Sequence, residues 1–250
     1  MPPRTGCTDP GSGFGVGRVR GSVLWVCVVV GCVLAAGCGD PEKTPQPVAV
    51  TSLPTTTTTV APVAEDALRA LLLTPEQVNP IMEATDMAVT RTHTALSDDS
   101  ATMEPLECLA IDGAAQEQVY AGSGYTGVRE QMLSEGDEFE HFVDQAVIAF
   151  PSAKQAAAFF ASAAQQWPAC HEYSHIQSGT TWTAGPIVNA DGMLSTVASQ
   201  DNAGNDVSWA CGRALTVANN VVVDVNTCSA DPRDTAVVIA GQIAAKVPNG

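Results

Sequence analysis

Four cysteines constrain the fold of this chain more than any other feature, because their oxidation would tie together segments that are far apart in sequence. They are Cys108, Cys170, Cys211 and Cys228. The other four of the eight cysteines lie within the first 38 residues. An even number of cysteines in an exported domain indicates a disulfide framework, and four cysteines allow three pairings.

The spacing of the last two cysteines favours one pairing. Asn219 and Asn220 lie midway between Cys211 and Cys228, within a strand-turn-strand pattern. Asn tolerates the positive φ angles of a two-residue hairpin turn. Around such a turn the two cysteines face each other in a non-hydrogen-bonded pair, where side chains approach closely. By elimination, the other two cysteines form a Cys108–Cys170 disulfide that closes a long loop.

The same hairpin predicts one core face and one solvent face, since side chains alternate along a strand. Arg213 and Asp224 fall on the second face, in diagonal positions where we expect them to pair in solvent. The first face is apolar and is expected to face the core, with Ala214, Thr216, Ala218, Val221, Val223 and Val225.

An export signal is expected at the start of the chain. Arg18 and Arg20 precede an uncharged apolar run from Val23 to Ala36, which is followed by Gly37 and Cys38. A basic start, a short apolar segment and small residues are the three parts of such a signal. The apolar run is shorter than the roughly 20 residues of a membrane-spanning helix.

Small residues leading directly into Cys38 resemble a bacterial lipobox, although Ala35 stands where Leu or Val is usual. This resemblance implies a lipoprotein signal peptide at residues 1–37, a lipid on the Cys38 thiol and anchoring to the outer face of the plasma membrane. The alternative is a plain secretory signal with an incidental cysteine. Both alternatives place the rest of the chain outside the cytoplasm, in the cell envelope.

Residues 38–64 are expected to form a flexible linker. Five prolines surround the consecutive threonines 55–59, and few large apolar residues are present. Such a segment cannot bury enough surface to offset the entropy of ordering it. Residues 65–250 are long enough for one domain with its own core.

The charge of the chain excludes some partners. The chain has 11 basic and 27 acidic residues, and without residues 1–37 it has 8 and 26, a net charge of −18. Such a charge repels nucleic acid and anionic lipid headgroups.

The order of expected elements predicts an α+β fold, a mainly antiparallel sheet with helices packed against it. Strands without regular helical crossovers dominate the pattern. The expected helices are 67–73, a helix capped by Thr74 and Gln77, an alanine-rich helix capped by Ser152 and Gln155, and one opened by Asp231-Pro232. The expected strands outside the cysteine hairpin are 123–133, 139–150, 180–188 and 193–199.

Residues 171–175 match the zinc-protease pattern H-E-x-x-H, with His171, Glu172 and His175. That chemistry needs a helix, so that both imidazoles share one face and Glu172 can act as the base. Pro168 and Cys170 lie just upstream, and no glutamate follows Tyr173. We therefore expect a loop or strand edge here, and a secreted zinc hydrolase is the alternative hypothesis.

Residues 122–127 match the G-x-G-x-x-G phosphate-loop pattern, with Gly122, Gly124 and Gly127. A phosphate loop needs a helix N-terminus after it, whereas strand-forming residues follow here. Glycines that allow two strands to approach closely are the preferred interpretation.

An ordered set of segments resembles the PknH-like extracellular domain family of mycobacteria. The segments are LLLTPEQVN (71–79), EC (107–108), VYAGSGYTGVR (119–129), QAVIAFPSA (145–153), WPAC (167–170) and CGRALTVANNVVVDV (211–225). The resemblance covers residues 65–248. It implies an α+β fold with two disulfides, a sensor-type domain and a cleft for an unknown envelope ligand.

The resulting hypothesis is a non-catalytic, lipid-anchored domain that binds a small molecule, glycan or lipid and needs no cofactor. A structural envelope protein without a ligand is a further alternative. Aromatic and bidentate polar side chains suit ligand recognition. On that basis the candidate binding residues are Tyr120, Tyr125, Arg129, Trp182 and Trp209.

Overall fold

The computed structural model describes residues 60–137, 139–201 and 209–248, all within one compact unit, Thr55–Gly250. The signal peptide, Cys38 and most of the expected linker lie outside the described residues. The helices are α1 (Pro75–Met82), α2 (Leu109–Asp112), α3 (Glu117–Tyr120), α4 (Ala153–Gln166) and α5 (Thr235–Lys246). Three 3-10 segments are η1 (Glu65–Leu71), η2 (Leu106–Cys108) and η3 (Trp167–Ala169).

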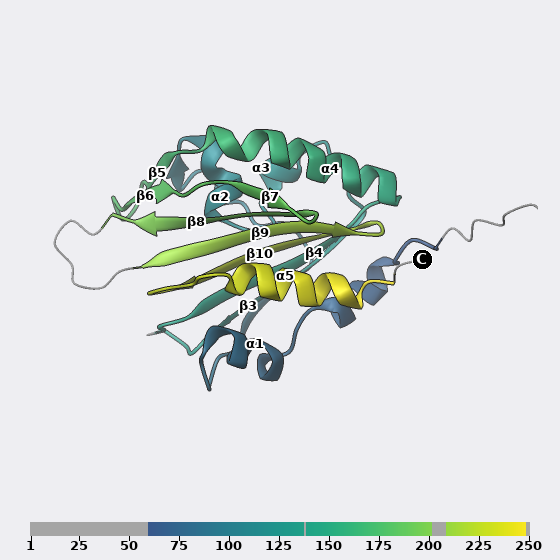
Figure 1. The fold of residues 1–250 in the computed structure, drawn as a ribbon, viewed down its shortest axis with the longest axis horizontal. Helices are drawn as coiled ribbons and strands as arrows, with labels where there is room; N and C mark the ends of the chain where they lie inside the picture. The colour runs from purple at the N-terminus through teal and green to yellow at the C-terminus, as the bar shows by residue number, and fades with distance from the viewer. Residues whose placement is uncertain (1–59, 138, 202–208, 249–250) are drawn as a thin grey trace, which may run out of the picture. The chain divides into compact units, whose positions relative to one another are not determined.

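The strands of the described residues form one antiparallel sheet (Figure 1). They are β1 (Ala88–His93), β2 (Met103–Glu104), β3 (Gly127–Ser134), β4 (Phe142–Ala149), β5 (Glu172–His175), β6 (Thr181–Ala184), β7 (Val188–Ala190), β8 (Met193–Gln200), β9 (Ala210–Ala218) and β10 (Val221–Ser229). Their order is β1-β3-β4-β10-β9-β8-β6-β5-β2, and β7 pairs with β8. The expected α+β class is therefore confirmed.

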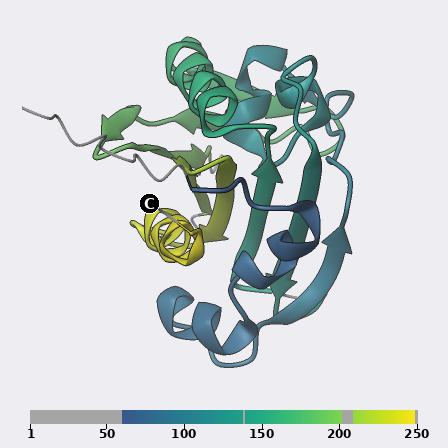
Figure 2. The same cartoon turned by 90° about the vertical axis from the view of Figure 1, so that its right-hand side faces the viewer.

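Helices cover both faces of the sheet, as the end-on view in Figure 2 makes clear. Helix α5 packs on β9 and β10 from one side, and α4 contacts the same two strands from the other side. The core on the α5 side also takes in η1 and α1. The core on the α4 side takes in α2, α3, η3 and both disulfides. We call these the α5 face and the α4 face.

The helix starts follow the capping signals of the sequence. At α1, Thr74 and Gln77 form a capping box, in which the backbone N–H of Thr74 donates to Gln77 Oε1 at 3.1 Å. At α4, the Ser152 hydroxyl accepts from the backbone N–H of Gln155. Each cap satisfies backbone donors that a helix start leaves free.

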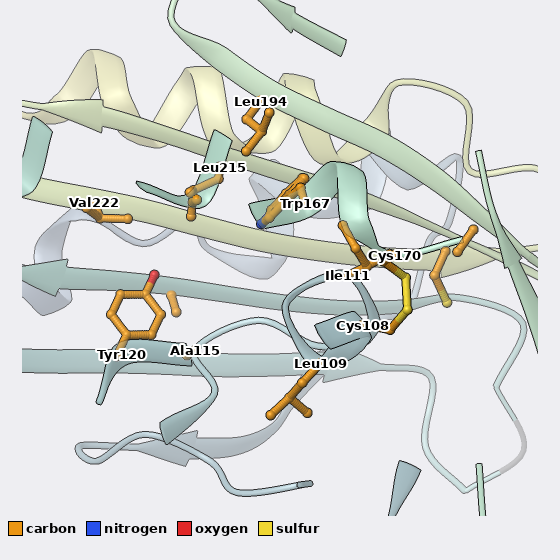
Figure 3. Close-up of a cluster of buried hydrophobic side chains, with 14 of the residues drawn as sticks. Cys108, Leu109, Ile111, Ala115, Tyr120, Trp167, Cys170, Leu194, Leu215 and Val222 are labelled. Atoms are coloured by element: carbon orange, nitrogen blue, oxygen red, sulfur yellow. A yellow bond between two sulfur atoms is a disulfide. The ribbon is translucent and has the colours of Figure 1, made fainter. Parts of the chain in front are cut away.

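The cysteine hairpin has the expected register. Ala218 pairs with Val221 across the turn, Asn219 has a φ of 49°, and Cys211 lies opposite Cys228. The structure contains the disulfides Cys211–Cys228 and Cys108–Cys170, which are the pairs favoured by the spacing. The Cys108–Cys170 disulfide joins η2 to the end of η3, within the α4-face core drawn in Figure 3.

The prediction that Arg213 and Asp224 pair in solvent is wrong. Their side chains are 1% and 3% exposed, and Arg213 Nη1 lies 2.8 Å from Asp224 Oδ1. The alternation of side chains was interpreted correctly, but the second face of the hairpin is covered by α2, α3 and Trp167 instead of water. The chain therefore buries an ion pair in its core.

Other boundaries also differ from the expectation. Strand β3 begins at Gly127 instead of residue 123, and helix α5 begins at Thr235, after Asp234, instead of at Asp231-Pro232. The segment 67–73 is the 3-10 segment η1, which ends at Leu71. The expected strand 180–188 is split into β6 and β7, which contact different parts of β8. The short elements β1, β2, α2 and α3 were not predicted, because they are too short or too polar for periodicity to indicate. For residues 171–175, the strand β5 agrees with one of the two expectations, a loop or a strand edge.

The buried ion pair holds the segment 110–120 against the sheet. Arg213 Nε and Nη2 donate to the carbonyl oxygen of Ala110 at 3.1 and 2.9 Å. On the other side of the pair, Asp224 Oδ2 accepts from the backbone N–H of Ala115 at 2.9 Å and from Tyr120 Oη at 3.0 Å. The Arg213 guanidinium also lies 5.3 Å from the ring centroid of Trp167, at cation–π distance.

We expect Arg213→Met to destabilise the domain by about 3–5 kcal/mol, because it leaves the Asp224 carboxylate buried without its counter-ion. Urea unfolding followed by tryptophan fluorescence measures the change. In a double-mutant cycle, Arg213→Met combined with Asp224→Asn should cost less than the sum of the two single changes. Additive losses would contradict a coupled ion pair.

Candidate functional site

A pocket of about 280 Å³ opens on the α4 face, next to the Cys211–Cys228 disulfide. Strands β3, β4, β9 and β10 supply its floor, and the segment that the Arg213–Asp224 pair holds down supplies one wall. Strands β5 and β6 supply His175, which contacts Asp112 of this wall, and Trp182. The pocket is thus built from parts of the chain more than 100 residues apart.

Aromatic side chains form the apolar part of this pocket. The ring centroid of Phe139 lies 6.0 Å from that of Phe142 and 6.1 Å from that of Trp209. Across the pocket, the Trp182 ring stacks on Tyr173 with centroids 6.0 Å apart. Phe139 is 42% exposed, so its ring is available to a bound molecule. Such rings offer flat apolar surfaces for a small ligand.

Polar side chains supply the rest of the lining. Asp144 and Asn226 are paired positions on β4 and β10, and both are 5% exposed. Asn226 Nδ2 donates to the carbonyl oxygen of Asp112 at 2.8 Å, which joins the floor to the wall. Asp99 is held by Gln116, whose Nε2 donates to Asp99 Oδ2 at 2.8 Å.

Asp144 belongs to a row of ionisable side chains that crosses the α4 face under the pocket. Glu130 on β3 lies beside Asp144 on β4, and Asp224 on β10 and Arg213 on β9 follow. Burial raises the pKa of Asp144 well above its ordinary value, and the charges of Glu130 and Asp224 raise it further. Burial also raises the pKa of Glu130, against the effect of His93, whose Nδ1 lies 2.9 Å from Glu130 Oε2.

A second polar pair lies in the pocket wall. His175 Nε2 lies 2.7 Å from Asp112 Oδ1, and the imidazole ring lies 5.7 Å from the Trp182 ring. The hydrogen bond to Asp112 raises the pKa of His175 above its ordinary value, despite partial burial. Asp112 also contributes to a raised pKa of Tyr173, whose main cause is burial.

Of the five candidate binding residues, the structure brings Trp182 and Trp209 together in the pocket. Tyr120 is fully buried, stacks on Phe159 at 4.2 Å and donates to Asp224, so it is a core residue. Tyr125 is 38% exposed and lies outside the pocket lining. Arg129 extends over the α5 face, where Nη1 lies 2.9 Å from Glu65 Oε1.

Sequence reasoning missed the acidic half of the pocket. Asp144 on β4 and Asn226 on β10 line the pocket and sit in largely apolar strands, and Glu130 lies beside Asp144 on the more polar strand β3. Each is a polar residue at a buried position. A polar residue in an expected core position is the signal that could have identified them, because burying such a group is costly without a purpose or a partner.

The H-E-x-x-H segment is not a zincin site. Residues 172–175 form β5, so His171 and His175 do not share the face of a helix. Glu172 is exposed, and the described residues contain no cluster of three or more His, Cys, Asp or Glu side chains that could hold a metal ion.

The glycines of residues 122–127 serve a turn and a close contact. Gly122 and Gly124 have φ angles of 71° and 78°, which disfavour other residues. A Cβ at Gly127 would lie 2.5 Å from Glu65 Cγ, so this glycine allows η1 to pack on β3. The prediction that these glycines allow two strands to approach closely is therefore wrong. Two of them form a turn, and the third allows η1 to contact β3.

No helix among residues 60–137, 139–201 and 209–248 has the length and apolar character needed to cross a membrane.

Comparison with known proteins identifies the family. Residues 63–246 match the model of the PknH-like extracellular domain. This chain belongs to that family. It is 37% identical over 191 residues to the serine/threonine-protein kinase PknH of Mycobacterium bovis, which covers 74% of this chain and 31% of the kinase. The kinase PknH of Mycobacterium tuberculosis H37Rv is also 37% identical, over 29% of its length.

The crystal structure of the extracellular domain of PknH from Mycobacterium tuberculosis has the same fold. It matches with a TM-score of 0.69 and 36% identity, over 74% of this chain and 97% of that domain. The chain spans about a third of the curated kinases it matches, and the matched part is their extracellular domain. The protein therefore carries an extracellular sensor-type domain, and the relatives give no catalytic role to it.

The Asp112–His175 pair predicts a pH effect. The raised pKa of His175 means that the pair stabilises the fold fully below the pKa of a free histidine, and that this stability is lost as the pH rises through the raised pKa. NMR titration of the His175 ring in wild type and in Asp112→Asn tests this. We expect the variant to titrate at lower pH, and an unchanged pKa would contradict the pairing.

Proposed function

We propose that this protein is a lipid-anchored, non-catalytic ligand-binding domain that samples small molecules in the cell envelope. The observation that carries the proposal is the pocket beside the Cys211–Cys228 disulfide, which combines an aromatic rim with a buried polar floor. Pockets that bind small molecules combine mostly apolar walls with a few placed polar groups. The membership in an extracellular domain family supports a location outside the cytoplasm.

The pocket is better suited to binding than to catalysis. Three of its four acidic and imidazole side chains are engaged in structural pairs, Asp112 with His175 and Asp99 with Gln116. Among the described residues that line the pocket, none carries a hydroxyl nucleophile, and the thiols of Cys211 and Cys228 are joined in a disulfide. A rigid floor in the centre of a sheet keeps these groups in place for recognition.

The size of the pocket limits its occupant. A cavity of about 150 Å³ accommodates a benzene molecule, so about 280 Å³ suits a compound of one or two rings or a short chain. A larger glycan or lipid would fit only with one end, and the rest would lie outside the pocket.

Native mass spectrometry of residues 38–250, purified from an envelope fraction of its own cells, tests ligand binding. We expect an adduct of constant mass on wild type. Trp209→Ala should reduce the adduct at least about fivefold, because it removes part of the aromatic rim. Tyr125→Ala is the matched control, since that ring is exposed outside the pocket, and it should keep the adduct.

Absence of any adduct on the wild-type protein, together with no thermal shift in envelope extracts, would contradict the proposal and favour a structural envelope protein.

Lipid anchoring through Cys38 gives a separate prediction. Cys38→Ser removes the thiol that would carry the lipid, so the variant should leave the membrane pellet or keep its signal peptide. Fractionation with immunoblotting measures this, and Cys32→Ser is the matched control because it lies inside the apolar run. A Cys38→Ser variant that remains in the pellet at mature size would contradict the anchor.

A further inference from the structure

Two buried polar atoms in the lining residues of this pocket lack a hydrogen-bond partner within the protein. They are Asp144 Oδ1, an acceptor, and Trp182 Nε1, a donor. Both residues are 5% exposed. Buried polar groups are nearly always paired, so a donor and an acceptor left free in one pocket indicate what a bound molecule supplies.

The free acceptor has a particular reason for lacking a partner. The neighbouring Glu130 carboxyl raises the pKa of Asp144, and neither group is a donor when ionised. Glu130 already accepts from Ser97 Oγ at 3.1 Å and contacts His93. A proton held between Asp144 and Glu130 is the simplest way to satisfy both carboxyls.

The charges around the pocket favour a cation as its occupant. Asp99, Asp112 and Asp144 line it, and the basic group among its lining residues is His175, which is paired with Asp112. The nearest guanidinium in the buried row, Arg213, is paired with Asp224. An anion would find one N–H donor, Trp182 Nε1, but no cationic group that is not already paired among the described lining residues. A cation would find the Asp144 carboxyl and aromatic faces for cation–π contact.

We infer that this pocket takes a small protonated amine that also carries an oxygen acceptor. The ammonium group binds Asp144, the oxygen accepts from Trp182 Nε1, and the apolar body lies among Phe139, Phe142 and Trp209. This inference rests on the proposed function, because it names the ligand class of the same site.

Binding of the amine displaces the shared proton. One ammonium cation enters, its N–H groups replace the proton between Asp144 and Glu130, and that proton leaves to solvent, so the buried charge is conserved. Because the pKa of this pair is raised, affinity should increase as the pH rises through it and then level off. The charged or titratable groups that face the pair or the pocket are His93, Asp99, Asp112, His175, Arg213 and Asp224.

Three matched probes test the charge preference. 2-Amino-1-phenylethanol, 1-phenyl-1,2-ethanediol and mandelate share the ring and the benzylic hydroxyl, and they differ in ending with an ammonium, a hydroxyl or a carboxylate. Titration calorimetry on residues 38–250 at pH 7 should show that the amine binds at least about tenfold more tightly than the diol, while mandelate does not bind.

Two variants show whether Asp144 is responsible. Asp144→Asn keeps the shape of the side chain and removes its charge. It should therefore reduce the affinity for the amine at least about tenfold and change the affinity for the diol less than about twofold. Asp191→Asn is the matched control, because it removes one charge from the β7–β8 turn, at the opposite end of β8 from the pocket. It should change neither the affinity for the amine nor the affinity for the diol. Amine titrations in two buffers of different ionisation enthalpy should show proton release in wild type and none in Asp144→Asn.

Equal binding of the amine and the diol, tighter binding of mandelate, or full amine affinity in Asp144→Asn would overturn the inference, as would absence of amine binding. These outcomes differ from failure of the proposed function, because a neutral or anionic adduct on the purified protein would leave the pocket a binding site and exclude only the amine.

Discussion

The buried ion pair between Arg213 and Asp224 is the interaction on which the rest of the structure depends. Burying two charges away from water is costly. The cost is reduced here because the two charges lie 2.8 Å apart and because backbone and side-chain groups form hydrogen bonds with both residues. Those groups belong to residues 110–120, whose regular structure is limited to two four-residue helices, α2 and α3. The ion pair therefore holds this segment in a position that its own helix propensity would not fix. The segment forms one wall of the pocket.

The pocket lies where the buried polar row comes closest to solvent. Arg213 balances Asp224, and His93 lies against Glu130, but Asp144 has no cation of its own. A protein selected for stability alone would gain from an apolar residue at this position, since an unpaired buried carboxyl destabilises the fold. We infer that the acid is retained because it binds something in the pocket, at a cost that the two disulfides and the covered sheet can offset.

Much of the fold followed from local rules, and the site followed from them only in part. The Asn219-Asn220 turn set the register of β9 and β10, and the caps at Thr74 and Ser152 placed two helices. Trp182 and Trp209 were recognised by residue type. The one available signal for Asp144 was a polar residue in an apolar strand, and Asp112 on the short helix α2 gave no such signal. Strand periodicity says which face a residue occupies, but it does not say whether water or a helix covers that face. That same gap led to the wrong prediction for Arg213 and Asp224.

The carboxyl pair beneath the pocket offers the most direct test. With side-chain carboxyls labelled with carbon-13, NMR titration of the ligand-free protein follows Glu130 and Asp144 individually. We expect the two to retain one proton at a pH where exposed carboxyls of the same protein have fully ionised, and to lose it when the amine probe is added. Full ionisation of both groups together with the exposed carboxyls would contradict a proton-sharing pair and the ligand class inferred from it.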